Sequence, residues 1–126
     1  ALVSVRELLI STIKDVTLLG ELDTYGALFS PDFAQTKAGV IRTSGYVVDT
    51  LLAACWVALN YQTPREAVLA AVNFGGDTDT IATITAALTA AWHPDIPVDT
   101  KWWQQTLNHQ LLNAHFEVFT DKFATS

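Results

Sequence analysis

Basic residues and cysteine are scarce in this chain. Of its 126 residues only seven are Lys or Arg, against thirteen Asp or Glu, and the net charge is −6. No cluster of basic side chains is present to neutralise phosphates, which argues against a surface for double-stranded nucleic acid. The single cysteine, Cys55, excludes an internal disulfide, and its apolar neighbours predict a small core residue rather than a reactive thiol.

Targeting and membrane signals are missing as well. The first residues show no basic region followed by an apolar one, and no Asn-x-Ser/Thr acceptor occurs. The uncharged run Thr80–Pro94 is shorter than the roughly 20 residues that cross a bilayer. These absences predict a cytoplasmic protein without a membrane segment. Half of the residues are hydrophobic, so a single globular domain is expected over residues 1–126.

Helical periodicity accounts for most of the chain. Apolar residues at three- and four-residue steps predict a helix over residues 2–19 that stops at Gly20. Three more helices are predicted at 46–60, at 64–73 after the capping sequence "TPRE", and at 78–92. Asp99 can cap a fifth helix, one face of which carries Trp103, Leu107, Leu111, Ala114 and Val118.

No segment alternates with period two for long enough to form a strand, so the predicted fold class is all-α. We expect a compact orthogonal helical bundle that forms the C-terminal portion of a larger all-helical domain. The helix after residue 80 is expected to be buried on all sides because it lacks charge. Residues 21–45 have no sustained period, and a connection of that length is expected to be functional or to pack on something else.

Two aspartates stand at the entrance of the fourth helix, in the stretch "NFGGDTDT". Within a helix, residues two apart point about 200° away from each other, but a cap residue is not helical. Asp77, Asp79 and the hydroxyls of Thr78 and Thr80 can therefore converge there. These oxygen donors suit Mg²⁺, Mn²⁺ or Ca²⁺ and do not suit zinc. The glycine pair before them also marks a place where the backbone must come close to something.

A simpler interpretation is that Asp77 or Thr78 only caps the helix, with Asp79 favoured by the helix dipole. An EF-hand is excluded, since Ile81 stands where the third oxygen ligand belongs. The three histidines are too scattered to form a metal site and are expected to be ordinary surface or partly packed residues.

The stretches "SGYVVDTLLAACWVAL" and "REAVLAAVNFGGDTDTIATITAAL" resemble the C-terminal part of the ADP-ribosylglycohydrolases, dinuclear-magnesium enzymes that remove ADP-ribose from modified targets. The resemblance covers about residues 44–92. It implies that Asp77, Asp79 and Thr80 bind metal, with Asp79 shared between two ions, and that Gly45 and Tyr46 contact ADP-ribose.

The cofactor that the resemblance implies is Mg²⁺, with Mn²⁺ as the alternative, and the partner is ADP-ribose or an ADP-ribosylated substrate. The Tyr46 ring could lie against a ribose or base while the backbone N–H groups of the loop stay free. The alternative for Tyr46 is a helix-start residue packed on Trp56.

Part of the family's site is missing from this chain. The family's other metal motif, a Ser or Thr followed by two adjacent aspartates, does not occur, and its N-terminal acidic residue has no counterpart, so no catalytic residue is predicted. Leu52 also stands where many relatives carry Glu. The simplest explanation is a C-terminal piece of a longer enzyme, inactive alone, which an N-terminal half or a second chain completes. Surfaces left uncovered would then favour self-association.

Two other functions are considered. A degenerate, non-catalytic family member could serve as a structural or ADP-ribose- or metal-binding helical module. A nucleotide-sugar transferase with a metal-binding "DxD" is the third hypothesis, but that class is built on parallel sheets, which the sequence pattern lacks.

Overall fold

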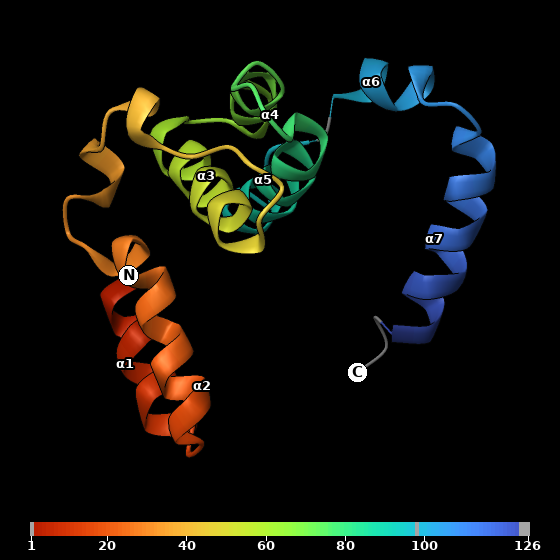
Figure 1. The fold of residues 1–126 in the computed structure, drawn as a ribbon. Coiled ribbons are helices and arrows are strands. Elements are labelled where there is room, and N and C mark those ends of the chain that lie inside the picture. The colour runs from red at the N-terminus through yellow and green to blue at the C-terminus, as the bar shows by residue number, and fades with distance from the viewer. Residues whose placement is uncertain (1, 98, 124–126) are drawn as a thin grey trace. The chain divides into compact units, whose positions relative to one another are not determined.

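Every regular element in the computed structural model, which describes residues 2–97 and 99–123, is a helix (Figure 1). The α-helices are α1 (Leu2–Thr12), α2 (Val16–Glu21), α3 (Val47–Asn60), α4 (Pro64–Val72), α5 (Thr78–Trp92), α6 (Thr100–Gln105) and α7 (His109–Phe123). Between α2 and α3 lie the 3₁₀ helices η1 (Leu22–Phe29), η2 (Phe33–Gln35) and η3 (Ala38–Val40). The predicted all-α class is confirmed. Within the described ranges, no helix is long and apolar enough to cross a membrane.

The contacts divide the chain into two units, Ala1–Ile96 and Pro97–Ser126. The first unit contains α1 to α5 and the 3₁₀ helices. In the second unit α6 contacts α7, and the rings of Trp103 and Phe116 lie 5.8 Å apart. The single domain expected over residues 1–126 stays a prediction.

The core of the first unit lies between α3, α4 and α5, which pack together (Figure 1). Its buried side chains are mostly small: Ala53, Ala54, Val57, Ala67, Ala71, Ile81 and Ala82. Small side chains at the contacts let helix backbones approach closely. Cys55 is buried as predicted, and Trp56 lies at the edge of this core, where its ring stacks on Phe74 at 5.4 Å.

The helices that form this core begin and end close to where the sequence places them. Thr63 caps α4 by accepting the backbone N–H of Glu66 at 3.2 Å, and Pro64 occupies the first turn. These starts and stops depend on bonds between residues three or four apart, so a local sequence signal is sufficient to locate them.

Two of the predicted helices are interrupted in the structure. The helix predicted over residues 2–19 becomes α1 and α2, because the Asp15 side chain accepts the N–H groups of Thr17 and Leu18 and starts a new helix. The helix predicted after Asp99 becomes α6 and α7, and Asn108 between them has a φ of 57°. Asn tolerates this left-handed conformation. Apolar spacing continues across both breaks, so periodicity alone did not reveal them.

The expectation that α5 is buried on all sides is wrong. Ile81, Thr85 and Thr89 form a fully buried stripe, whereas Ala87 and Ala90 are exposed. Helices α3 and α4 both pack on α5, and Ala82, Ile84 and Leu88 beside the stripe are buried or partly buried in the same core. Small neutral residues occupy the open side of α5 as well, which is why the sequence did not distinguish the two sides.

Candidate metal and ligand site

The glycine pair before α5 forms a tight backbone turn. Gly75 and Gly76 have φ values of 88° and 70°, in the left-handed region that favours glycine. The turn brings Gly76 and Asp77 against Thr43, whose carbonyl oxygen accepts the Asp77 N–H at 2.9 Å. A methyl group on Gly76 would overlap that carbonyl oxygen and approach the Thr43 hydroxyl oxygen to 2.6 Å. The close backbone approach predicted here is therefore confirmed, and its partner is Thr43.

The three predicted metal ligands lie together at the N-terminus of α5. The Thr80 hydroxyl donates a hydrogen bond to Asp77 Oδ1 at 3.1 Å. Asp79 follows in the first turn of the same helix. Asp77 and Thr80 are therefore in direct contact and Asp79 lies in the same turn, and metal binding by the three residues stays a prediction.

Asp77 occupies the cap position of α5 without acting as a side-chain cap. Its carboxylate accepts no N–H group from the first turn of the helix. Three other polar residues of the chain do accept such bonds in front of their helices, namely Asp15, Thr63 and Asp99. The simple capping interpretation therefore does not account for Asp77, whose carboxylate is turned toward Thr80 and Asp79 instead.

Asp79 is exposed, so the expected cost of burying a carboxylate does not arise at this residue. Hydrogen bonding to the Asp77 side chain, and then to the backbone N–H groups of Thr80 and of Asp79 itself, holds the pKa of the Asp79 carboxyl below its usual range. The carboxylate form is thus favoured, which is the form that binds cations.

Gly45 lies directly beside Asp77. A Cβ atom built on Gly45 would stand 3.1 Å from Asp77 Oδ2, a tight contact. The sequence placed Gly45 and Asp77 in two separate motifs, one expected to touch ADP-ribose and the other to bind metal. The structure brings the two positions together, and only the absence of a side chain at Gly45 leaves space between them.

Tyr46 is 57% exposed at the start of α3. The Trp56 ring stacks on Phe74, and packing of the Tyr46 ring on Trp56 stays a prediction. The Tyr46 N–H donates to Ser44 Oγ at 3.2 Å, so the expectation of free backbone N–H groups is wrong at this position. The reason is local: a Ser side chain readily bonds the N–H two residues further on.

The donors at this site match magnesium in kind but not in number. All are oxygen atoms, as Mg²⁺ prefers, but an octahedral ion needs six ligands and two ions need more. In the part of the chain that the structure describes, no group of three or more His, Cys, Asp or Glu side chains could hold an ion. Asp77, Asp79 and Thr80 therefore fit one portion of a metal site.

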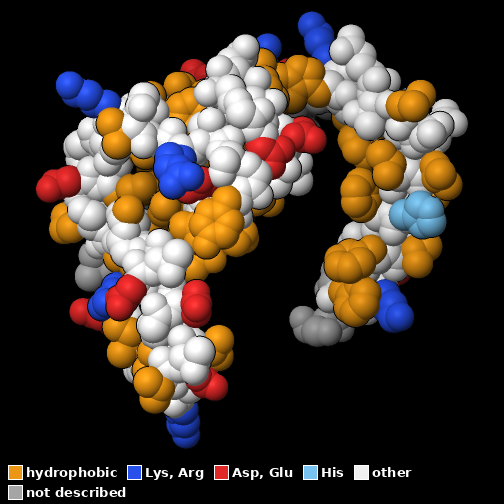
Figure 2. Space-filling view, viewed as in Figure 1, with side chains coloured by type: hydrophobic (Ala, Val, Ile, Leu, Met, Phe, Trp, Pro, Cys, Tyr) orange, Lys and Arg blue, Asp and Glu red, His pale blue; other side chains and the backbone are white. Residues whose placement is uncertain are grey.

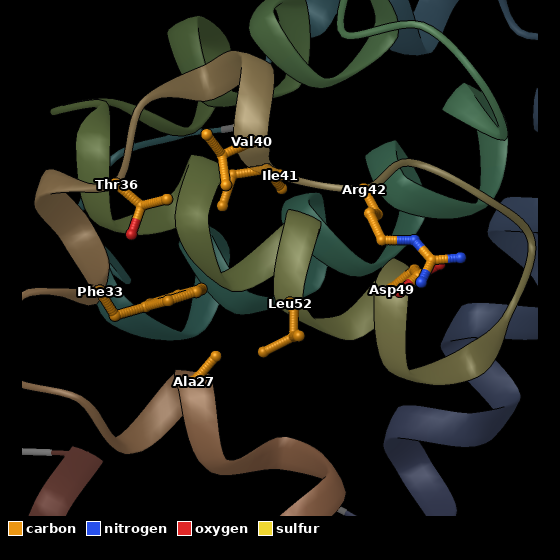
Figure 3. A pocket seen from close by; sticks show the side chains of 8 residues that line it. All are labelled: Ala27, Phe33, Thr36, Val40, Ile41, Arg42, Asp49 and Leu52. Carbon is orange, nitrogen blue, oxygen red and sulfur yellow. The ribbon is translucent and has the colours of Figure 1, made fainter.

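A cavity of about 170 Å³ lies near this site but does not contain it (Figure 3). Apolar side chains line most of it, and Arg42 and Asp49 stand at one end. Leu52 forms part of the apolar lining. None of the predicted metal or ligand residues borders this cavity.

The residues that hold the two segments together were not predicted from the sequence. Thr43 supplies the carbonyl oxygen that joins the glycine turn, and Ser44 accepts the N–H of Tyr46. Ser44 in turn donates to Asp49, which is buried in the first turn of α3. One signal was available: Asp49 is a lone charge on an otherwise apolar helix, and a buried charge requires partners.

Comparison with known proteins identifies the relatives of this chain. A family model described as ADP-ribosylglycohydrolase matches residues 3–125, well beyond the stretch of 44–92 that carries the recognisable motifs. The chain is 30% identical over 82 residues to the ADP-ribosylarginine hydrolase Tri1 of Serratia proteamaculans. The aligned region makes up 65% of this chain and 22% of that protein.

The chain is also 35% identical over 71 residues to the ADP-ribosylarginine hydrolase Tri1 of Pseudomonas putida. That aligned region makes up 56% of this chain and 19% of the relative. The chain thus matches about a fifth of the length of these curated relatives. No solved structure matches it.

Proposed function

The chain belongs to the ADP-ribosylglycohydrolase family, and we propose that it supplies part of the active site of a magnesium-dependent hydrolase. This enzyme would cleave the glycosidic bond that joins ADP-ribose to a modified target. One observation carries the proposal: Gly45, at the segment expected to touch ADP-ribose, lies against Asp77 of the metal motif. A substrate held by metal ions requires its protein contacts to be adjacent to the metal ligands.

In this proposal Asp77, Asp79 and Thr80 hold the metal. The pKa of the Asp79 carboxyl lies below its usual range, so this group is a carboxylate at neutral pH, and the Thr80 hydroxyl lies against Asp77 Oδ1. Carboxylate and hydroxyl oxygens are donors that suit Mg²⁺. When bound, magnesium would supply the positive charge that orients the ribose hydroxyls and activates a water.

The reaction in this proposal is a hydrolysis. The hydroxyl of a water adds to the anomeric carbon of ADP-ribose, and the bond from that carbon to the target side chain breaks. The other proton of the water goes to the departing side chain. The backbone of Gly45 stands directly beside Asp77, and the exposed ring of Tyr46 offers a flat surface for a ribose or base.

We propose ADP-ribosylated arginine as the first target to assay, because both relatives are named ADP-ribosylarginine hydrolases. The remaining metal ligands and the catalytic acid would come from the region of the complete protein outside this chain. The chain by itself should be inactive, since three oxygen donors do not complete the coordination of two ions.

The test uses the complete protein and an ADP-ribosylated arginine substrate, with release of free ADP-ribose as the measurement. Release should require Mg²⁺ and should fall by roughly a hundredfold or more in Asp79→Ala, because a metal ligand is lost. Asp95→Ala removes the same charge at an exposed position outside the site and should behave like wild type. Equal rates for both variants would refute the role of Asp79.

The second candidate is a non-catalytic ADP-ribose-binding or structural module. The observation in its favour is that the described residues lack a group of three or more carboxylate, His or Cys side chains able to hold an ion. Saturable binding of ADP-ribose by the complete protein, with no release from any ADP-ribosylated substrate, would support this function over the hydrolase.

A further inference from the structure

Asp49 is a buried carboxylate to which the proposed function gives no task. It lies in the first turn of α3, and its side chain is only 8% exposed. A buried charge is costly unless ion pairs and hydrogen bonds compensate it. Its partners therefore indicate what it does in the fold.

Both partners of Asp49 lie in the segment that precedes α3. Ser44 Oγ donates to Asp49 Oδ2 at 2.6 Å, and Arg42 Nε lies 3.2 Å from the same oxygen. Figure 3 shows the side chains of Arg42 and Asp49 directed toward each other at the end of the cavity. The bond from Ser44 is short and has a charged acceptor, which makes it stronger than a neutral one, whereas the Arg42 side chain is 77% exposed, so water screens its ion pair.

Ser44 also forms hydrogen bonds with two residues besides Asp49. Its hydroxyl oxygen accepts the N–H of Tyr46 at 3.2 Å, and its carbonyl oxygen accepts the Thr50 hydroxyl at 3.0 Å. Thr43, immediately before it, accepts the N–H of Asp77. The segment 42–46 is thus tied to α3 through Asp49 and Thr50 and to the entrance of α5 through Thr43.

We infer that Asp49 is a positioning residue that holds the segment 42–46 in place, so that Gly45 lies beside the metal motif. The expected effect of Asp49 on substrate binding rests on the proposed function, whereas its effect on the position of the segment 42–46 does not. A favourable interaction with the α3 dipole also stabilises an acid in the first turn, but it does not require the bonds to Ser44 and Arg42.

Amide hydrogen exchange in the full chain tests this inference directly. In Asp49→Asn, which keeps the size of the side chain but removes its charge, the N–H groups of Tyr46 and Asp77 should exchange roughly tenfold faster. The N–H of Ala71 in α4 should change by less than about twofold, because the helix core is not involved. Asp23→Asn is the charge control, since Asp23 forms an exposed pair with Arg6 at 3.8 Å.

A second pair of variants keeps the test decisive if Asp49→Asn unfolds. Ser44→Ala removes the hydroxyl that links Asp49 to Tyr46 and should cause the same local loosening, whereas Ser44→Thr keeps the hydroxyl and should restore slow exchange. Because Ser44 and Asp49 share one bond, the effects of Ser44→Ala and Asp49→Asn should be less than additive in the double variant.

The result of the hydrogen-exchange experiment and the result of the ADP-ribose-binding experiment can be interpreted independently. Wild-type exchange rates at Tyr46 and Asp77 in both Asp49→Asn and Ser44→Ala would overturn the inference, whether or not the protein binds ADP-ribose. In the complete protein, Asp49→Asn should weaken ADP-ribose binding by roughly tenfold and leave Mn²⁺ binding within about twofold. Wild-type protein that binds no ADP-ribose would refute the proposed function but leave the exchange result valid.

Discussion

The backbone N–H of Asp77 donates a hydrogen bond to the carbonyl oxygen of Thr43 across 2.9 Å. These two residues are far apart in the sequence, and each belongs to a loop that leads into a core helix. Their contact places Gly45 beside the Asp77 carboxylate. The contact between the two motifs is therefore made by main-chain atoms, and side chains at Ser44 and Asp49 support it.

Gly76 is the residue that permits this contact, and replacing it should separate the two loops. Gly76→Ala adds a methyl group that overlaps the Thr43 carbonyl at a left-handed φ of 70°. We expect a loss of about 2–4 kcal/mol in unfolding free energy by denaturant titration. Gly75→Ala is the matched control, since Gly75 has a φ of 88° but open space around it, and it should lose only about 1 kcal/mol. Equal losses would show that the approach to Thr43 is unimportant.

Asp79 should contribute to divalent-cation binding. Titration of Mn²⁺ into the chain, followed by electron paramagnetic resonance, should show affinity that falls roughly tenfold or more in Asp79→Ala. Asp95→Ala, which removes an equal charge from another exposed position, should bind like wild type. If wild type and Asp79→Ala bind Mn²⁺ alike, the metal assignment fails.

Cys55 should make the protein less stable in alkali. Burial raises the pKa of its thiol to about 11, whereas an unfolded thiol ionises near its ordinary pKa of about 8.5. The unfolded state therefore releases its proton first, so stability is unaffected below about pH 8.5 and falls as the pH rises toward 11. At about pH 10 the loss should be about 1–2 kcal/mol relative to pH 7.

The variant Cys55→Ala isolates this effect from other groups that titrate in alkali. The difference in unfolding free energy between wild type and Cys55→Ala should shift in favour of the variant between about pH 7 and pH 10. A maleimide should also label Cys55 only after denaturation, because the folded thiol is buried. A constant difference between the two proteins across this pH range would contradict the prediction.

The isolated chain should self-associate. Large hydrophobic side chains are exposed in both units, including Leu8, Val16, Leu107, Val118 and Phe119. Figure 2 shows such side chains gathered along α7. Apolar surfaces of this kind favour association in water. Light scattering should give an average mass that rises with concentration, and a single monomeric species at high concentration would contradict this prediction.

Much of the fold and part of the candidate site followed from local sequence signals. The limits of α3, α4 and α5 agree with the predicted helices, and at α4 the reason is the Thr63 cap, which acts over three residues. The convergence of Asp77, Asp79 and Thr80 was also predictable, since all three lie within one turn of a helix entrance. The breaks before α2 and α7 were not, because single Asp and Asn residues interrupt an apolar spacing that continues.

The sequence by itself determined that the chain is all-α, which residues could bind a cation, and which family its motifs resemble. Only the tertiary structure decided that Thr43 is the partner of the glycine turn, that Asp49 holds Ser44, and that one stripe of α5 is buried. Helix and cap formation depends on neighbours a few residues away, which a sequence displays directly. Contacts between loops depend on how closely the helices α3, α4 and α5 pack, and their small side chains set that distance. This packing joins residues that are distant in the sequence, so local patterns do not reveal it.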